Sequence, residues 1–214
     1  MRPELVEGRI LDDPDEVASF LTENNLTREG ILAVRDAAYV QRIDCSPLMA
    51  VNAPGTFAYH YGVLEMRVQF LGQYWDISRE GGIEAIINPQ KNTKIVFQNV
   101  DVACSRLIDP KPRSEKGAGV ERECQGNLFE FYGISTPKKI RAPKAGTAVH
   151  FIMVDDRGAV EVSRPVIEDK KFTGFIERVF VSDGADLDAQ EVLPSGPLDQ
   201  PVDDFDVQVR RRSE

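Results

Sequence analysis

Hydrophobic residues in the first third of the chain recur every three or four positions, the spacing of helices packed on a core. Asp13 is a suitable N-cap for the first helix, and the apolar positions within 17–21 follow at helical spacing. Thr27 begins a second helix, which we expect to reach about Ile43. Pro47 lies just beyond it, and proline cannot continue the hydrogen-bond ladder of a helix.

A third helix is predicted from a cap at Thr56 to Gly72. Its apolar positions form one stripe, at Phe57, Tyr61, Leu64, Val68 and Leu71. Aromatic residues crowd this helix and its exit, at Phe57, Tyr59, Tyr61, Phe70, Tyr74 and Trp75. Such residues can stack on nucleic-acid bases. At helical spacing they more often fill a core, and we expect that here.

The pattern then changes to short β-rich runs separated by turns. Strands are predicted over 83–88, 94–98, 128–132, 147–154, 159–164 and 172–181. The first two runs flank a polar turn and predict a hairpin. A second hairpin is predicted around Asp155–Gly158, because two β-rich runs flank a turn that ends in glycine. Pro165 is expected to end its returning strand.

Helices followed by strands indicate an α+β fold rather than repeated βαβ units. We expect N-terminal helices packed on a mainly antiparallel sheet built from hairpins. The predicted single domain covers 1–182, with a helical part at 13–72 and a β part at 83–182. Residues 183–214 are rich in acid and contain proline, which is typical of a solvated C-terminal extension.

The overall charge narrows the choice of partners. The 26 Lys and Arg residues face 35 Asp and Glu, a net charge of -9. Such a balance disfavours a grip on nucleic acid or anionic membrane by the protein as a whole. No apolar run of signal-peptide or membrane-spanning length is evident, so we expect a cytoplasmic protein without a membrane partner.

Metal, disulfide and cofactor chemistry find little support. The three cysteines are odd in number and no two have the CxxC spacing, which argues against a disulfide framework and a cysteine zinc site. Phosphate-binding glycine motifs are also absent from the sequence. We therefore expect neither a metal nor a cofactor.

Basic residues nevertheless gather in one part of the chain, here called the basic segment (111–144). It contains Lys111, Arg113, Lys116, Arg122, Lys138, Lys139, Arg141 and Lys144. Four glutamates oppose these eight residues, which leaves a local charge of +4. The segment predicts a face for phosphates, nucleic acid or an acidic protein partner. Solvated loops are the simpler interpretation, and docking of the acidic extension within or between chains is a third.

Three carboxylates were considered as weak catalytic candidates: Asp155, Asp156 and Glu161. Metal-dependent nucleases hold a cation with such acids on adjacent strands and place a lysine two positions after one of them. In this sequence the residue two positions after Glu161 is Ser163, not lysine. A hairpin turn accounts equally for the spacing of the three acids, so the sequence favours a non-catalytic protein.

We therefore expect a non-catalytic binding or regulatory protein that acts on a macromolecular partner through the basic segment and the acidic stretch 183–206. One alternative is an enzyme for a phosphorylated or nucleic-acid substrate, which would need basic side chains and carboxylates to converge in one concave pocket. Another is an assembly protein that forms homo-oligomers through its C-terminal extension.

Overall fold

The protein has an α+β fold, seen in a computed structural model that describes residues 8–113, 120, 124, 147–169 and 171–188. The helices are α1 (Pro14–Glu23), α2 (Arg28–Ile43), α3 (Ala53–Phe70) and the short α6 (Ala185–Asp188), with a 3₁₀ turn at Glu80–Gly82. The side chain of Asp13 accepts hydrogen bonds from the first turn of α1, and Thr27 does so for α2, as predicted. Helix α3 begins earlier than predicted, after Asn52.

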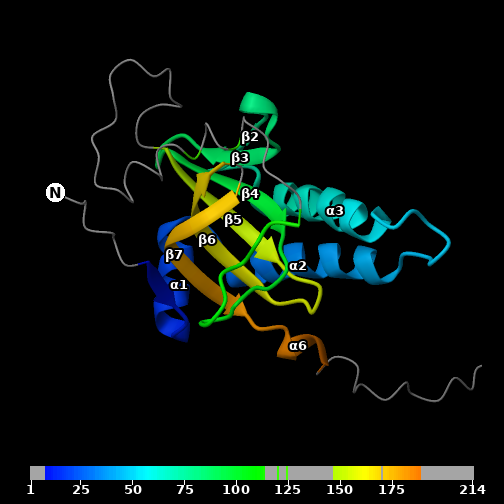
Figure 1. The fold of residues 1–214 in the computed structure, drawn as a ribbon. Coiled ribbons are helices and arrows are strands. Elements are labelled where there is room, and N and C mark those ends of the chain that lie inside the picture. Colours follow the sequence, from blue (N-terminus) through cyan, green and yellow to red (C-terminus); the bar gives the residue numbers. More distant parts are fainter. Residues whose placement is uncertain (1–7, 114–119, 121–123, 125–146, 170, 189–214) are drawn as a thin grey trace, which may run out of the picture.

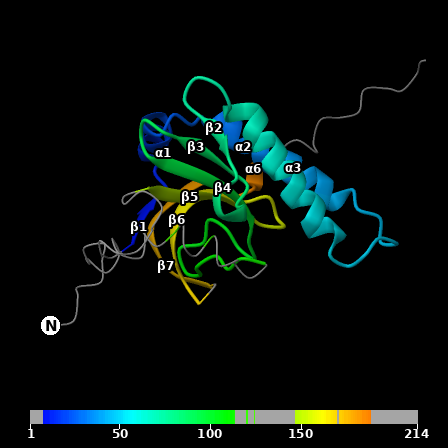
Figure 2. The ribbon, with the colours of Figure 1, turned by 90° about the horizontal axis from the view of Figure 1, so that it is seen from above.

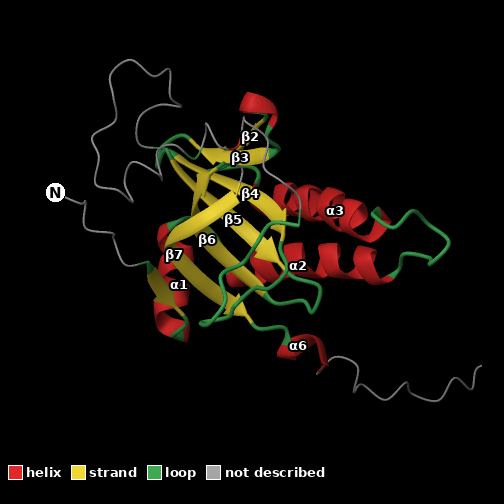
Figure 3. Cartoon of the chain, viewed as in Figure 1, coloured by secondary structure: helices red, strands yellow, loops and turns green. Residues whose placement is uncertain are grey.

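The strands form one seven-stranded mixed sheet in the order β1-β7-β6-β5-β4-β3-β2 (Figure 3). Their bounds are β1 (Arg9–Leu11), β2 (Asp76–Ser78), β3 (Ala85–Asn88), β4 (Thr93–Asn99), β5 (Ala148–Val154), β6 (Val160–Glu168) and β7 (Lys171–Ser182). The predicted hairpins β3–β4 and β5–β6 are confirmed. However, β4 pairs with β5 in parallel, and so does β1 with β7, so hairpins build only part of the sheet.

Two predictions about strands need correction. Pro165 was expected to end a strand, but β6 continues through it to Glu168. The register with β7 shifts between Arg164 and Pro165, and such a bulge accommodates a residue that lacks an N–H donor. The three-residue strands β1 and β2, at the two edges of the sheet, were not predicted at all.

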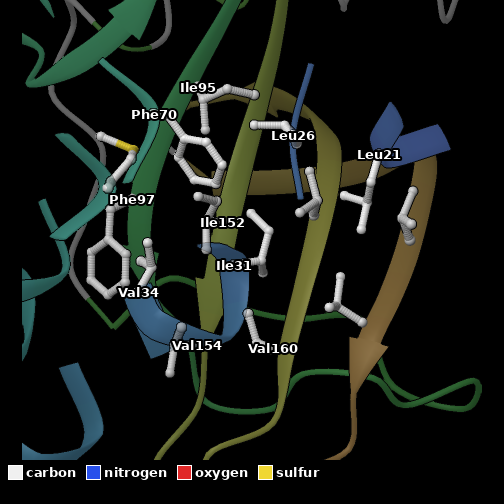
Figure 4. Close-up of a cluster of buried hydrophobic side chains, with 14 of the residues drawn as sticks. Leu21, Leu26, Ile31, Val34, Phe70, Ile95, Phe97, Ile152, Val154 and Val160 are labelled. Carbon is white, nitrogen blue, oxygen red and sulfur yellow. The ribbon is translucent and has the colours of Figure 1, made fainter. Parts of the chain in front are cut away.

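Helices α1, α2 and α3 cover one face of the sheet (Figures 1 and 2). Side chains that alternate along the strands point into this layer, among them Ile95 and Phe97 from β4 and Ile152 and Val154 from β5 (Figure 4). The intervening residues pack on the other face in a second cluster, which includes Ala103 and Cys124 from the long connection between β4 and β5. Both faces of the central strands are therefore covered.

Helix α3 lies close to strand β4 because its inner face has a glycine where the two elements meet. A Cβ atom added at Gly62 would overlap the ring of Phe97, so glycine permits the close approach of the helix to β4. The inner face is made by Ala58, Gly62, Val63, Met66 and Phe70. Of the aromatic residues expected to fill the core, Phe70 and Trp75 are buried and Tyr59 packs half-buried against it, whereas Phe57, Tyr61 and Tyr74 are exposed. The apolar stripe from Phe57 to Leu71 is exposed at all five positions.

The first acidic residues beyond β7 are tied to the helical layer. The guanidinium of Arg35, in α2, is fully buried and donates two hydrogen bonds to the carboxylate of Asp186, at 2.9 and 2.5 Å. A third bond, from the same guanidinium to the carbonyl of Gly158, joins the β5–β6 turn to this contact. The hydrogen bond from Arg35 lowers the pKa of Asp186.

Replacing Asp186 by Asn should lower the free energy of unfolding by about 1–3 kcal/mol, because it removes one of the two carboxylates that pair with the buried guanidinium of Arg35 and leaves only Asp36. The side chain of Asp186 is 38% exposed, which moderates the loss. A carboxylate whose pKa is depressed in the folded state stabilises the fold above its unfolded pKa of about 4 and loses that contribution as the pH falls toward the folded value. Urea unfolding at pH 7 and pH 3 measures both effects.

The matched control is Asp44→Asn, an exposed carboxylate without an ion pair in the described part of the chain. The variant Asp186→Asn should be less sensitive than the wild type to acid, and Asp44→Asn should behave like the wild type. Equal stability of the two variants would contradict the role given to the Arg35–Asp186 pair.

A candidate anion-binding pocket at the end of strand β4

A pocket of about 650 Å³ opens where β4 ends between the C-terminal end of α2 and the start of α3. We call it the arginine pocket. It is lined by Arg42, Val51, Asn52, Pro54, Gly55, Thr56, Tyr59, Gln98, Asn99 and Arg113. Its volume lies within the range of about 300–1,000 Å³ that is usual for small-molecule sites.

Asn99, the last residue of β4, holds the walls of this pocket together. Its side-chain oxygen accepts a hydrogen bond of 2.9 Å from Arg42 in α2. Its amide nitrogen donates one of 2.9 Å to the carbonyl of Gly55 in α3, and its backbone carbonyl accepts from the backbone N–H of Arg113. One buried side chain thus connects two helices, and its main chain holds the start of the basic segment.

Arg42 supplies a cationic group that is partly buried and not neutralised by an adjacent acid. Its hydrogen bond to the neutral amide of Asn99 uses one of five N–H donors, and no ion pair to Arg42 occurs in the described residues. Burial and the nearby charge of Arg113 lower the pKa of Arg42, and they outweigh the opposing effect of the carboxylates of Asp156 and Asp155. These two costs on the charged guanidinium would be offset by a bound anion.

The first turn of α3 adds to the same electrostatic environment. Asn52, Gly55 and Thr56 line the pocket, so the N-terminal end of an 18-residue helix faces it. The N-terminus of a helix carries a partial positive charge and backbone N–H groups without intrahelical partners. No acidic residue occupies this first turn, and Asn52 makes no side-chain cap.

Two residues of the predicted basic segment are described by the structure. Arg113 lines the pocket, donates to the carbonyl of Val100 at 3.0 Å and forms an ion pair with Asp156. Lys111 is exposed and does not line the pocket. The remaining six predicted basic residues lie outside the described residues: Lys116, Arg122, Lys138, Lys139, Arg141 and Lys144.

The structure also locates the three carboxylates considered for catalysis. Asp155 is fully buried and accepts backbone hydrogen bonds from Ala103, Arg157 and Ala159. Asp156 is half-exposed; burial raises its pKa, but the hydrogen bond from Arg113 prevails and lowers it. Neither of them lines the arginine pocket.

Glu161 is likewise fully occupied. Arg178 donates to both of its carboxylate oxygens, at 3.0 and 2.7 Å, and Ser163 and the backbone N–H of Cys104 also donate to it. These bonds fasten the connection after β4 to the second face of the sheet. They leave the catalytic role of Asp155, Asp156 and Glu161 a prediction without support from geometry.

The described part of the chain contains no group of three or more His, Cys, Asp or Glu side chains that could hold a metal ion. The buried His150 instead pairs with Glu177 at 2.9 Å. Burial raises the pKa of Glu177, but hydrogen bonds from His150 and Arg9 outweigh it and lower that pKa.

Sequence reasoning missed two central residues of the pocket, Arg42 and Asn99. Arg42 stands in the last turn of a predicted helix, where a basic residue usually complements the helix dipole. Asn99 directly follows a predicted strand and carried no motif. Only the meeting of α2, α3 and β4 gives the two residues a shared role.

Comparisons with protein-family models, curated proteins and solved structures find no match for this chain. Among the described helices, none is both long and apolar enough to cross a membrane.

Replacing Asn99 by Ala should lower the free energy of unfolding by about 1–3 kcal/mol, because the partly buried guanidinium of Arg42 loses its acceptor and the helical carbonyl of Gly55 loses its second donor. Chemical denaturation measures this change. Asn52→Ala is the matched control, since Asn52 lines the same pocket but makes no cap bond. An equal loss in both variants would contradict the bridging role of Asn99.

Proposed function

We propose that the protein is a non-catalytic binding protein that holds a phosphate-bearing ligand in the arginine pocket. The observation that carries this proposal is Arg42: a partly buried guanidinium, paired with a neutral amide, that faces a pocket shared with Arg113 and the start of α3. Arg42 and the start of α3 both favour negative charge at the same place, and Arg113 adds donors there although its charge is shared with Asp156.

The lining of the pocket indicates the class of ligand. Guanidinium groups with their planar sets of donors suit phosphate or carboxylate oxygens. Beside them, Val51, Pro54 and Tyr59 offer apolar surface for an organic group. A phosphorylated small molecule or the end of a nucleic-acid strand combines both parts, whereas free phosphate would use only the polar side.

The absence of carboxylates from the described lining favours binding over catalysis. Hydrolysis of a phosphate ester needs a positioned base or metal beside the anion. Asp155 and Glu161 are engaged by hydrogen bonds elsewhere, and Asp156 is paired with Arg113. Among the described residues, the pocket brings together no carboxylate and basic side chain of the kind that the enzyme alternative requires, which supports the binding proposal.

The proposal keeps the binding role expected of the basic segment, because Arg113 belongs both to that segment and to the pocket. A macromolecular ligand would extend from the pocket along the segment, while a small ligand would not. Both kinds of ligand carry phosphate, and the affinities of probes of different length distinguish a macromolecular ligand from a small one.

Arg42→Gln should weaken the binding of phosphate-bearing probes tenfold or more, since it removes a charge-assisted hydrogen bond from a partly desolvated site. Calorimetric titration with pyrophosphate, a nucleoside monophosphate and a short single-stranded oligonucleotide gives the affinities. Binding should also weaken as salt is raised, because ions screen the guanidinium charge.

The matched control is Arg79→Gln, at an arginine whose side chain is 62% exposed and which lies outside the pocket. It should bind each probe as the wild type does. If none of the probes binds the wild type, or if both variants lose affinity equally, the pocket is not the anion site that we propose.

A further inference from the structure

The outer face of α3 carries an apolar stripe that the rest of the described chain leaves exposed. We call it the α3 seam: Phe57, Tyr61, Leu64, Val68 and Leu71. Their exposed fractions run from 38% at Phe57 to 64% at Val68. Together they expose on the order of 400 Å² of side chain, the size of the largest apolar patch on a typical monomer, and such patches are often functional.

The spacing of the seam identifies the kind of surface that covers it. Its four residues within α3 are separated by four, three and four positions, the a and d pattern of a coiled coil, and Leu71 follows directly after the helix as its extended C-cap. A partner helix that crosses at a shallow angle buries such a stripe by inserting side chains between those of the seam. No position of the seam is charged, so its occupant needs no ionic partner there.

We propose that a second copy of this chain covers the seam, with the two α3 helices antiparallel about a two-fold axis. The side chains complement themselves in this arrangement. With the axis between Gly62 and Val63, Tyr61 faces Leu64 of the second copy and Phe57 faces its Val68. Because of the two-fold axis each of these pairs occurs twice, so the interface contains four contacts between an aromatic ring and an aliphatic side chain. No large ring faces another large ring, and no two small side chains face each other.

The shape of the molecule leaves room for this pairing. Helices α2 and α3 form a hairpin that projects past the sheet, away from α1 and the edge strand β1 (Figures 1 and 2). The inner face of α3 is already packed on β3 and β4, and α2 lies along one flank. The seam lies on the remaining side. A standard interface needs about 800 Å² per partner, so the seam and its polar rim predict a reversible dimer rather than an obligate one.

The salt dependence of dimerisation distinguishes a dimer formed through the α3 seam from one formed through the acidic extension. Two copies that each carry a charge of -9 repel one another, and salt screens that repulsion. A dimer held by the apolar seam should therefore become stronger as salt is raised. Docking of acidic on basic segments would become weaker under the same change.

Sedimentation equilibrium of the full chain at low and high salt tests the proposal. The wild type should show a concentration-dependent dimer that is favoured by salt. Leu64→Glu, at the centre of the seam, should shift the monomer–dimer constant at least tenfold toward monomer, because two carboxylates would be buried in one interface. Leu107→Glu is the matched control, at a leucine 95% exposed on a loop outside the seam, and should dimerise as the wild type does.

A far-UV spectrum and the thermal midpoint of Leu64→Glu confirm that the monomer is folded. A wild type that stays monomeric at all concentrations, or a dimer that persists in Leu64→Glu, overturns the proposal. Loss of dimer in both glutamate variants overturns it too, since it would assign the effect to added charge rather than to the seam.

Cross-linking tests the orientation of the helices. In a Cys45→Ser background, chains with Phe57→Cys should form disulfides with size-tagged chains that carry Val68→Cys. Two Phe57→Cys chains should not react, because antiparallel pairing sets these positions 11 residues apart, about 16 Å at 1.5 Å per residue. Cross-linking of Phe57→Cys only with itself would indicate parallel helices and overturn the proposed arrangement.

Discussion

The side-chain amide of Asn99 is the constraint on which the candidate site depends. It offers one acceptor and one donor in fixed geometry, and the first binds Arg42 while the second binds Gly55. Without Asn99 the partly buried guanidinium would lose its side-chain acceptor, and the carbonyl of Gly55, which also belongs to helix α3, would lose a second donor. Asn99, at the end of β4, binds both Arg42 and Gly55. It therefore fixes the end of α2 and the start of α3 relative to each other, with the arginine pocket between them.

A second set of polar contacts gives that pocket its other wall. Asp155 and Glu161 accept backbone hydrogen bonds from Ala103 and Cys104, which fasten the chain after β4 to the sheet. The chain then returns so that Arg113 lies beside Asn99. Buried carboxylates are costly unless fully paired, and these are paired. Two of the acids predicted as catalytic candidates, Asp155 and Glu161, thus hold the chain that leads to Arg113, and the third, Asp156, pairs with Arg113 directly.

The sequence predicted local structure well and the meeting of distant segments poorly. Caps at Asp13 and Thr27 and the hairpin around Gly158 depend on residues close in the chain, and they were found. The parallel pairing of β4 with β5 spans a connection of nearly fifty residues and leaves no local pattern. The pocket is of the same kind, because Arg42, Asn99 and Arg113 share no motif and meet only in the folded chain.

Helix α3 shows why periodicity alone could not choose its buried face. Both of its sides are apolar: one of small residues around Gly62, the other the seam of larger ones. The stripe of larger side chains has the regular spacing expected of a core face, yet the sheet takes the face with Gly62, because the ring of Phe97 fills the space above β4 and only glycine fits against it. The bulky face is therefore left outward, with a spacing that a second helix can bury. The same close packing that brings α3 to the edge of the arginine pocket thus also exposes the surface by which two copies are proposed to meet.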